Sequence, residues 1–233
     1  MQVVLIFMKK IVFCLMALVA LTMMTGVRLQ AQTKDMFPMD KGLQISYICY
    51  DADGKQTGSF TRVNKEAVGE MTNGHIIAEY NFYHADGSPF WKSDNVVKIE
   101  MGRRSGASYT IIDLMSKFMK VRHLLPTGDP STVTTDYAIG DKLPDAEVAV
   151  KLGHMDIKIL IRARSVKTIG FVTVKGGTFQ AWNLKETVIT KTPVGSTSVE
   201  TDTWYAPGVG VLKQSIYENS KLKSSLELTN IQR

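Results

Sequence analysis

The sequence predicts an all-β protein with a single antiparallel sheet, curled into a roll or a partly closed barrel. Apolar and polar residues alternate over short segments, so that in residues 42–50 one face carries Leu43, Ile45, Tyr47 and Cys49. Turn residues separate these segments, as in the hairpin signal Asp-Ala-Asp-Gly at 51–54. Strands and helices do not alternate, as they would in a parallel sheet. Because long sheets twist and exposed edges invite pairing, we expect curling.

In the first half of the mature chain, the pattern predicts strands at residues 42–50, 56–63, 75–83, 90–101 and 108–114. The segment 56–63 is polar apart from Phe60 and Val63, which predicts an edge or exposed strand. Residues 113–122 hold apolar side chains at helical spacing, namely Leu114, Met115, Phe118 and Met119. We therefore expect at most one short helix after the N-terminal leader.

The second half is almost entirely strand, predicted at residues 147–152, 155–163, 165–174, 178–190, 196–205, 209–217 and 222–229. Residues 126–130 are predicted as a loop. The stretch 201–214 contains Trp204 and Tyr205 directly before a turn at Pro207 and Gly208. We expect the two rings to be buried at a tight corner where Gly208 has a positive φ.

The first 31 residues have the pattern of a signal peptide. Lys9 and Lys10 precede an apolar run at 11–24, and Ala31 is a suitable cleavage residue. The apolar run is shorter than the ~20 residues of a membrane anchor, which is the alternative. Cys14 lies within the run, so lipidation is not expected. The sequence thus predicts a signal peptide at 1–31, a single all-β domain at 32–233 without a transmembrane segment, and a location in the periplasm or outer cell envelope.

Charge and cysteine content exclude several classes of function. Without Lys9, Lys10 and Arg28, 25 basic residues stand against 22 acidic ones, a net charge of +3. The closest basic groups, Arg103-Arg104 and Arg162-Ala163-Arg164, are predicted to lie on strand or turn surfaces, so nucleic acid is not expected as a partner. Cys49 is the one cysteine of the mature chain, and its alternation with apolar residues indicates packing rather than a reactive thiol.

Catalytic and metal-binding signatures do not emerge from the sequence. Ser105 lies in Gly-Arg-Arg-Ser-Gly, which does not match a nucleophile elbow. The histidines lie far apart and lack ligand spacing: His75, His84, His123 and His154. Five carboxylates fall in turns, where they are expected to bond their own backbone rather than Ca²⁺: Asp51, Asp53, Asp86, Asp141 and Asp145. We therefore predict no catalytic, cofactor-binding or metal-binding residue and no cofactor.

Four segments resemble the exported Gram-negative family catalogued as domain of unknown function 3108 and its relatives: residues 140–145, 174–179, 204–210 and 224–229. The Trp-Tyr-x-x-Gly-x-Gly corner at 204–210 is the most specific of them. The resemblance implies a curled sheet and an envelope location, and it transfers no activity. Ala181-Trp182 stands where the family pattern has Cys-Tyr. The signature residues, predicted to be structural, are Gly140, Asp141, Leu143, Pro144, Gly177, Thr178, Phe179, Trp204, Tyr205, Gly208 and Gly210.

Three functional hypotheses follow from the sequence. The first is an exported cell-envelope protein with a non-enzymatic binding or structural role, whose partner is an envelope protein, a lipid or a glycan. The second is a periplasmic carrier that holds a lipid or glycan against apolar or aromatic side chains on the concave side of the sheet. The third is a hydrolase of unrecognised type, since catalytic residues far apart in the sequence leave no local motif.

Overall fold

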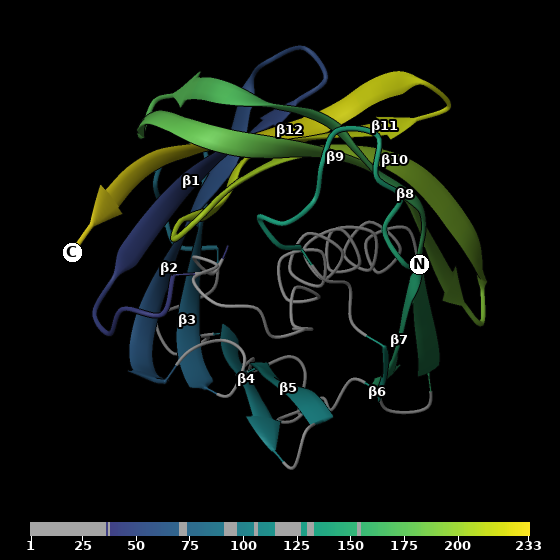
Figure 1. Ribbon diagram of the computed structural model, residues 1–233, viewed down its shortest axis with the longest axis horizontal. Coiled ribbons are helices and arrows are strands. Elements are labelled where there is room, and N and C mark those ends of the chain that lie inside the picture. The colour runs from purple at the N-terminus through teal and green to yellow at the C-terminus, as the bar shows by residue number, and fades with distance from the viewer. Residues whose placement is uncertain are drawn as a thin grey trace.

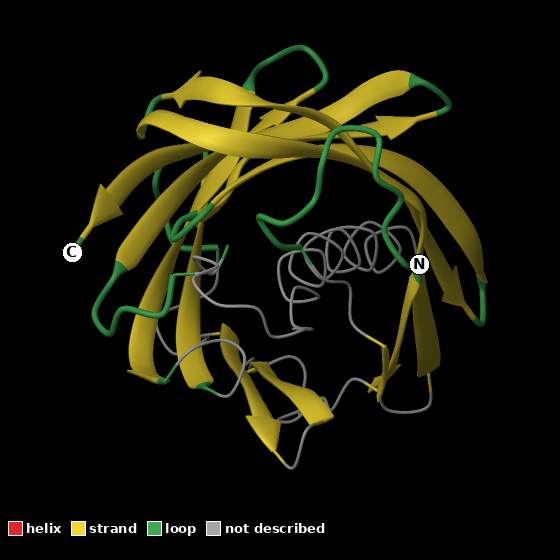
Figure 2. Cartoon of the chain, in the orientation of Figure 1, coloured by secondary structure: helices red, strands yellow, loops and turns green. Residues whose placement is uncertain are grey.

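The computed structural model describes residues 36, 38–69, 74–90, 97–104, 107–114, 127–129, 133–152 and 155–233. The predicted signal peptide at 1–31 and residues 115–122 of the predicted helix lie outside these ranges. The described residues form twelve strands and no helix (Figure 2). Nothing in this part of the chain is a helix of the length and apolarity that crossing a membrane requires.

The strands are β1 (Gln44–Asp51), β2 (Gln56–Val68), β3 (His75–His84), β4 (Val97–Arg104), β5 (Ala107–Leu114), β6 (Thr127–Asp129), β7 (Ala146–Leu152), β8 (Met155–Val174), β9 (Gly177–Thr192), β10 (Gly195–Ala206), β11 (Gly210–Glu218) and β12 (Lys221–Gln232). All belong to one sheet in the order β5-β4-β3-β2-β1-β12-β11-β10-β9-β8-β7-β6. The pairing is antiparallel throughout. The first and last strands therefore pair with each other at the centre of the sheet.

The sheet is curled and its two ends, β5 and β6, are not paired with each other in the described structure, which confirms the predicted curled all-β fold (Figure 1). Register shifts mark the bends: one lies between Arg162 and Ser165 in β8, and another between Trp204 and Tyr205 in β10. Such bulges bend a strand and increase its twist. They let a long sheet curve around its own apolar face instead of extending flat.

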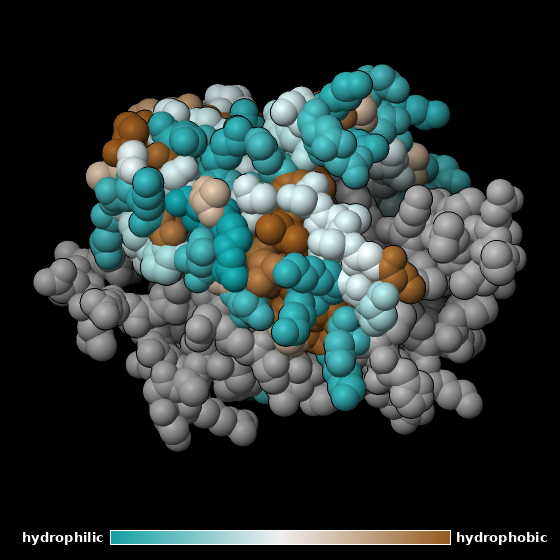
Figure 3. All heavy atoms as spheres, turned by 90° about the vertical axis from the view of Figure 1, so that its right-hand side faces the viewer, coloured by the Kyte–Doolittle hydropathy of each residue, from teal (hydrophilic) through white to brown (hydrophobic). Residues whose placement is uncertain are grey.

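Alternation along each strand separates an inner face from an outer one. In β4, Val97, Ile99 and Met101 are buried, whereas Lys98 between them is exposed. Across the sheet the inner face is mainly aliphatic and aromatic, and it forms one continuous core cluster. On the outside, the side view in Figure 3 shows polar side chains around a smaller hydrophobic patch. The apolar face of the sheet is thus the face enclosed by the curl.

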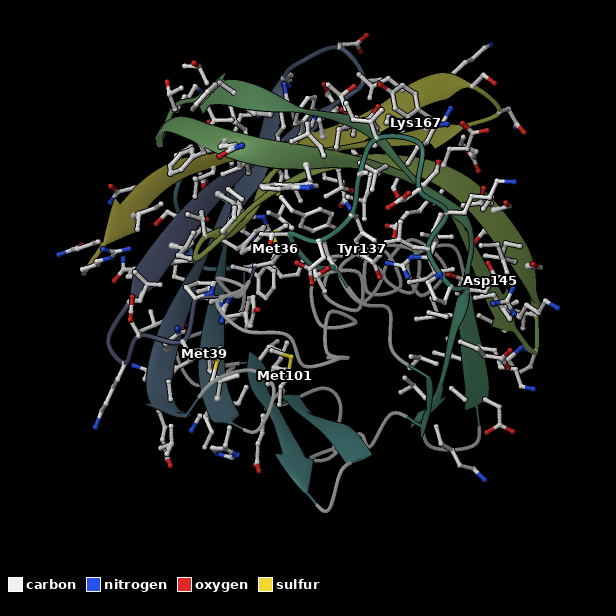
Figure 4. All side chains as sticks on the ribbon, in the orientation of Figure 1. Met36, Met39, Met101, Tyr137, Asp145 and Lys167 are labelled. Carbon is white, nitrogen blue, oxygen red and sulfur yellow. The ribbon has the colours of Figure 1, made fainter. Side chains whose placement is uncertain are left out.

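Two segments outside the strands pack on the inner side of the sheet. The lead-in to β1 buries Met36 and Leu43, and the loop at residues 133–145 buries Val133 and Leu143. Figure 4 shows Met36 together with Tyr137 inside the curve of the sheet. Both segments cover part of the face that would otherwise meet solvent.

Three predictions about the strands are wrong. The segment predicted as an edge strand, β2, lies between β1 and β3, because its polar residues Arg62 and Asn64 are buried on the inner face. Residues 155–163 and 165–174 form one strand, β8, since the chain passes the bend as a bulge instead of a turn. The loop predicted at 126–130 contains the short strand β6, which pairs with β7.

Candidate binding site on the inner face of the sheet

A buried polar cluster lies within the apolar inner face, on the strands β8 to β11. Pairing places Glu186 opposite Thr201, and Thr203 opposite Gln214, so these side chains share one face. Arg164 joins the cluster from β8 through an ion pair with Glu186. Each of these five residues is at most 7% exposed. The predicted surface position of Arg164 is therefore wrong.

The bulge in β8 explains why Arg164 points inward. Ala163 has a φ of 52°, and the register to β9 shifts between Arg162 and Ser165. An extra residue at a bulge redirects the side chain that follows it. Arg164 Nε then donates to Glu186 Oε1 at 2.7 Å, and Arg164 Nη1 donates to the carbonyl oxygen of Pro144 at 2.8 Å. A buried guanidinium requires such partners, because its desolvation is costly.

The signature turn at 140–144 is docked against this bulge. The amide of Gly140 donates to the carbonyl of Val166, and the amide of Leu143 donates to the carbonyl of Arg164. Val166 in turn donates to the carbonyl of Asp141. Gly140 has a φ of +91°, a conformation that strains any residue with a Cβ. Pro144 supplies the carbonyl that Arg164 binds, so these signature residues lie beside the polar cluster and hold its loop.

The corner at 204–210 reaches the same cluster from β10 and β11. Tyr205 is 2% exposed, and Trp182 is its cross-strand partner. The indole N–H of Trp182 donates to the carbonyl of Tyr137, in the loop at residues 133–145, at 3.1 Å. Gly208 has a φ of +67°, which confirms the positive φ expected at this turn. Two signature segments that are about sixty residues apart in the chain thus converge on one part of the inner face.

Trp204 takes the opposite side of the sheet from Tyr205. Its ring is half-buried, and the ammonium of Lys213 lies 5.5 Å from the ring centroid. Lys213 is also the cross-strand partner of Trp204. The corner therefore buries one of the two predicted rings fully and the other only in part.

The third signature segment forms the β8–β9 hairpin. Gly177 has a φ of +134°, and the hydroxyls of Thr173 and Thr178 are 2.9 Å apart. The neighbouring Gly176 donates its amide to the carbonyl of Leu228 in β12, and a Cβ at Gly176 would lie 2.9 Å from Leu228 Cγ. Phe179 is half-buried against the core. Through Gly176 the tip of this hairpin contacts β12.

The N-terminal half of the inner face carries an aromatic group instead. Tyr47 and Phe60 stack with centroids 4.7 Å apart, and Phe82 and Tyr80 lie 5.6 and 6.4 Å from Phe60. The side-chain amide of Asn64 donates to the carbonyls of Pro38 and Asp40, both at 3.0 Å. This half therefore holds the lead-in segment by packing and by backbone hydrogen bonds.

Three buried tyrosines have a raised pKa. Burial raises the pKa of Tyr205, and the nearby Glu186 carboxylate raises it further. Burial likewise raises the pKa of Tyr47 and of Tyr80, against the opposing effect of the Arg62 charge. Their phenolate forms are disfavoured because the inner face solvates charge poorly.

The other candidate residues of the sequence lie apart from the cluster. Asp51 and Asp86 accept hydrogen bonds from backbone amides of their own turns, and Asp141 does so from Ala138, as predicted. Ser88 donates to Asp86 and lowers the pKa of that carboxyl. Cys49 is half-buried beside the core. No group of three potential metal ligands occurs in the part of the chain that the structure describes. Ser105, His123 and His154 lie outside it.

The sequence did not reveal the cluster itself. Thr201, Thr203 and Tyr205 alternate on one face, which is detectable, but polar residues at such positions normally indicate the solvent side. Glu186 and Gln214 carry no local motif. Only the pairing of four strands brings these residues together.

A family of sequences and two solved structures match most of this chain. The DUF3108-like family matches residues 40–228. A structure from Bacteroides fragilis NCTC 9343, described provisionally as an exported protein with a YmcC-like fold, superposes with a TM-score of 0.65 at 20% identity and covers 84% of this chain and 98% of that one. A structure from Parabacteroides distasonis ATCC 8503, described provisionally as a lipoprotein, gives 0.63 at 16% identity, with 86% and 100% covered.

Identities at this level show a shared fold and nothing more specific. A comparison with the curated proteins finds no match. The family match at residues 40–228 includes both halves of the sheet and all the signature residues named above. The chain belongs to the DUF3108-like family.

Proposed function

We propose that this protein is a non-enzymatic binding protein of the cell envelope, and that it holds the apolar part of a lipid on the inner face of its curled sheet. One observation carries the proposal: both ends of the sheet present aliphatic walls on the enclosed face. On one side these are Ile76, Ala78, Val97, Ile99 and Met101, and on the other Val148, Val150, Ile157, Ile159 and Ile161.

The shape of the sheet supports this assignment. The two walls belong to strands near opposite ends of the sheet, which curl toward each other in Figure 1. Ligand sites for apolar molecules are concave, mostly aliphatic and aromatic, and contain few polar groups. The inner face has this composition, with its polar residues concentrated on β8 to β11 and at Arg62 and Asn64.

A lipid fits this face better than a glycan. Sugars bind proteins by stacking on open aromatic faces, and here Tyr47, Phe60 and Phe82 pack on one another. The indole of Trp182 donates a hydrogen bond to the carbonyl of Tyr137 in the loop at residues 133–145. The aromatic side chains thus contact one another, and the proposed contacts of the lipid are with the aliphatic walls.

An envelope location is part of the proposal. The predicted signal peptide at residues 1–31 supports export, and the structural neighbours are described as exported or as lipoproteins. Sequencing the exported protein from its N-terminus should give a start at Gln32, or within a residue or two of it. Mature protein that begins at Met1 or Met8 and stays in the inner membrane would contradict this.

Native mass spectrometry tests the binding function. The chain is produced with its leader in a Gram-negative host and purified from the envelope without detergent. We expect a bound mass that disappears after extraction with organic solvent, and the stripped protein should bind a neutral fluorescent lipid such as the methyl ester of cis-parinaric acid. Protein that carries no added mass and does not bind the probe after stripping would refute the proposal.

A pair of neighbouring variants localises the site. Ile99 is fully buried on the inner face of β4, and Lys98 beside it is exposed on the outer face. Ile99→Gln places an amide on the proposed lipid wall and should weaken probe binding at a temperature where circular dichroism shows native strand content. Lys98→Gln is the matched control and should bind like the wild type. Equal probe binding by both variants would show that the lipid does not contact this wall.

A further inference from the structure

Two polar atoms in the buried cluster have no hydrogen-bond partner among the described residues. They are Thr201 Oγ1 and Gln214 Oε1, and both residues are 3% exposed. A buried polar atom without a partner is costly, and native structures contain few of them. Two such atoms from adjacent strands on one face require an explanation.

The register places the two atoms within reach of one small group. Thr203 lies opposite Gln214, and Thr201 is two residues away on the same strand and the same face. Diagonal neighbours of this kind are about 7–8 Å apart. Gln214 Nε2 donates to Thr203 Oγ1 at 2.9 Å, which fixes the amide with its free oxygen available to a ligand.

The electrostatics around them favour a neutral partner. Glu186, opposite Thr201, is neutralised by Arg164 at 2.7 Å. An anion brought to this place would meet the Glu186 carboxylate and the Gln214 carbonyl oxygen, and a cation would meet the Arg164 guanidinium. A charged head group would also lose its hydration inside an apolar face.

The same face continues as an apolar surface on either side of the cluster. Leu184 and Val188 flank Glu186 on β9, and Leu226 lies opposite Gln214 on β12. Beyond Val188 the pairing continues to Ile161 and then to Ala146, in the aliphatic wall of β7 and β8. A polar group at Thr201 and Gln214 is thus joined to the wall proposed for the lipid tail.

We propose that Thr201 and Gln214 bind the head group of this lipid, and that the head group is an uncharged one that both donates and accepts hydrogen bonds, such as a hydroxyl or a carboxamide. This inference rests on the proposed function and names its ligand class. The hydroxyl of Thr201 serves as donor or acceptor, and Gln214 Oε1 accepts a hydrogen bond from the ligand. The preferred ligand is a neutral amphiphile, not a fatty acid.

The test compares three probes with the same acyl chain: monooleoylglycerol, methyl oleate and oleate. Their affinities for stripped wild-type protein are measured by displacement of the methyl ester of cis-parinaric acid. We expect monooleoylglycerol to bind about tenfold more tightly than methyl oleate, as one or two added hydrogen bonds would give. Oleate should not bind more tightly than methyl oleate.

Two isosteric variants then test the residues. Thr201→Val and Gln214→Met should each reduce the affinity for monooleoylglycerol about three- to tenfold and leave that for methyl oleate unchanged. Ligand-free Thr201→Val should melt at or above the wild-type temperature, because it removes an unpaired hydroxyl. Thr203→Val is the control: it breaks an existing hydrogen bond and should lower the melting temperature.

The outcomes separate this inference from the proposed function. If the three probes bind equally and both variants match the wild type, the head-group site is wrong while lipid binding stands. If oleate binds most tightly, the neutral class is wrong. A lower melting temperature of ligand-free Thr201→Val would show that the hydroxyl is already satisfied, which overturns the site. Failure of all three probes to bind would refute the proposed function itself.

Discussion

Among the described side chains, each half of the sheet buries one arginine on its inner face, and each arginine holds a segment that crosses that face. Arg62 in β2 donates to the carbonyl of Pro38 at 3.5 Å, and Arg164 in β8 donates to the carbonyl of Pro144 at 2.8 Å. Arg62 lies beside the hydroxyls of Tyr47 and Tyr80, whereas Arg164 is paired with Glu186. The two halves thus attach a crossing segment by the same kind of contact.

The difference between them lies in the surroundings. In the N-terminal half, Tyr47, Phe60 and Tyr80 pack ring against ring, and the charge of Arg62 acts on the two tyrosines. In the C-terminal half, an ion pair and three uncharged polar side chains share the face. We propose that the first half serves mainly as core and that the second contains the head-group site. Four changes test this contrast, from the largest expected effect to the smallest.

Breaking the ion pair should have the largest effect. Arg164→Met leaves the Glu186 carboxylate buried without its partner and should lower the free energy of unfolding by about 3–5 kcal/mol. The double variant Arg164→Met/Glu186→Leu replaces the pair with apolar side chains and should recover much of this loss. Urea denaturation measures both.

Arg162→Met is the matched control for that experiment. Arg162 is two residues away on the outer face, where its ion pairs with Asp145 and Glu147 are partly exposed. Removing these pairs should cost at most about 1 kcal/mol. An Arg164→Met variant as stable as this control would contradict the role given to the cluster.

The corner offers a comparison between adjacent residues. Tyr205→Ala empties a fully buried position and should cost about 3–5 kcal/mol, as for other large buried aromatics. Trp204→Ala removes a half-buried ring and should cost less. We propose that both are structural anchors, so melting temperatures should fall in that order. An unchanged melting temperature for Trp204→Ala, with lost binding, would make Trp204 a ligand platform.

Alkaline pH should destabilise the fold, because both halves of the sheet contain buried tyrosines. Below pH ~10 the tyrosines are neutral in the folded and unfolded states. As the pH rises above that value, unfolded tyrosines lose their protons while Tyr47, Tyr80 and Tyr205 keep theirs, because their folded pKa is raised. Stability should therefore fall by about 1.4 kcal/mol per pH unit for each of them.

Absorbance near 295 nm reports tyrosine ionisation, and circular dichroism reports the fold. The ionisation of three tyrosines should coincide with unfolding. Reversible ionisation of all eight tyrosines in the folded protein would contradict the burial described here.

The lead-in contact should have the smallest effect. Asn64→Ala removes two hydrogen bonds to the carbonyls of Pro38 and Asp40 and should cost about 1–3 kcal/mol. Limited proteolysis should then cut near residue 40 while the sheet stays intact. Asn81→Ala, at a half-buried position on the neighbouring strand, is a suitable control. Equal protease resistance of the two variants would show that Asn64 does not hold the lead-in.

The sequence by itself determined the fold class, most strand positions and the family. Alternation and turn residues are local, and hairpins such as β1–β2 follow from neighbouring residues at the Asp51–Gly54 turn. The conformation of Gly208 could be predicted for the same reason. The aromatic signature at 204–210 was also evident, although the pattern could not show which ring lies inside.

Only the tertiary structure decided which polar residues face the core. Thr201, Gln214, Glu186 and Arg164 resemble solvent-facing residues along their own strands, and a bulge at Ala163 reverses the expected side of Arg164. Their common face depends on the register of four strands and on the curl of the whole sheet, which are long-range properties. A sequence pattern encodes the period of a strand, whereas the partner of each side chain depends on pairing between distant segments.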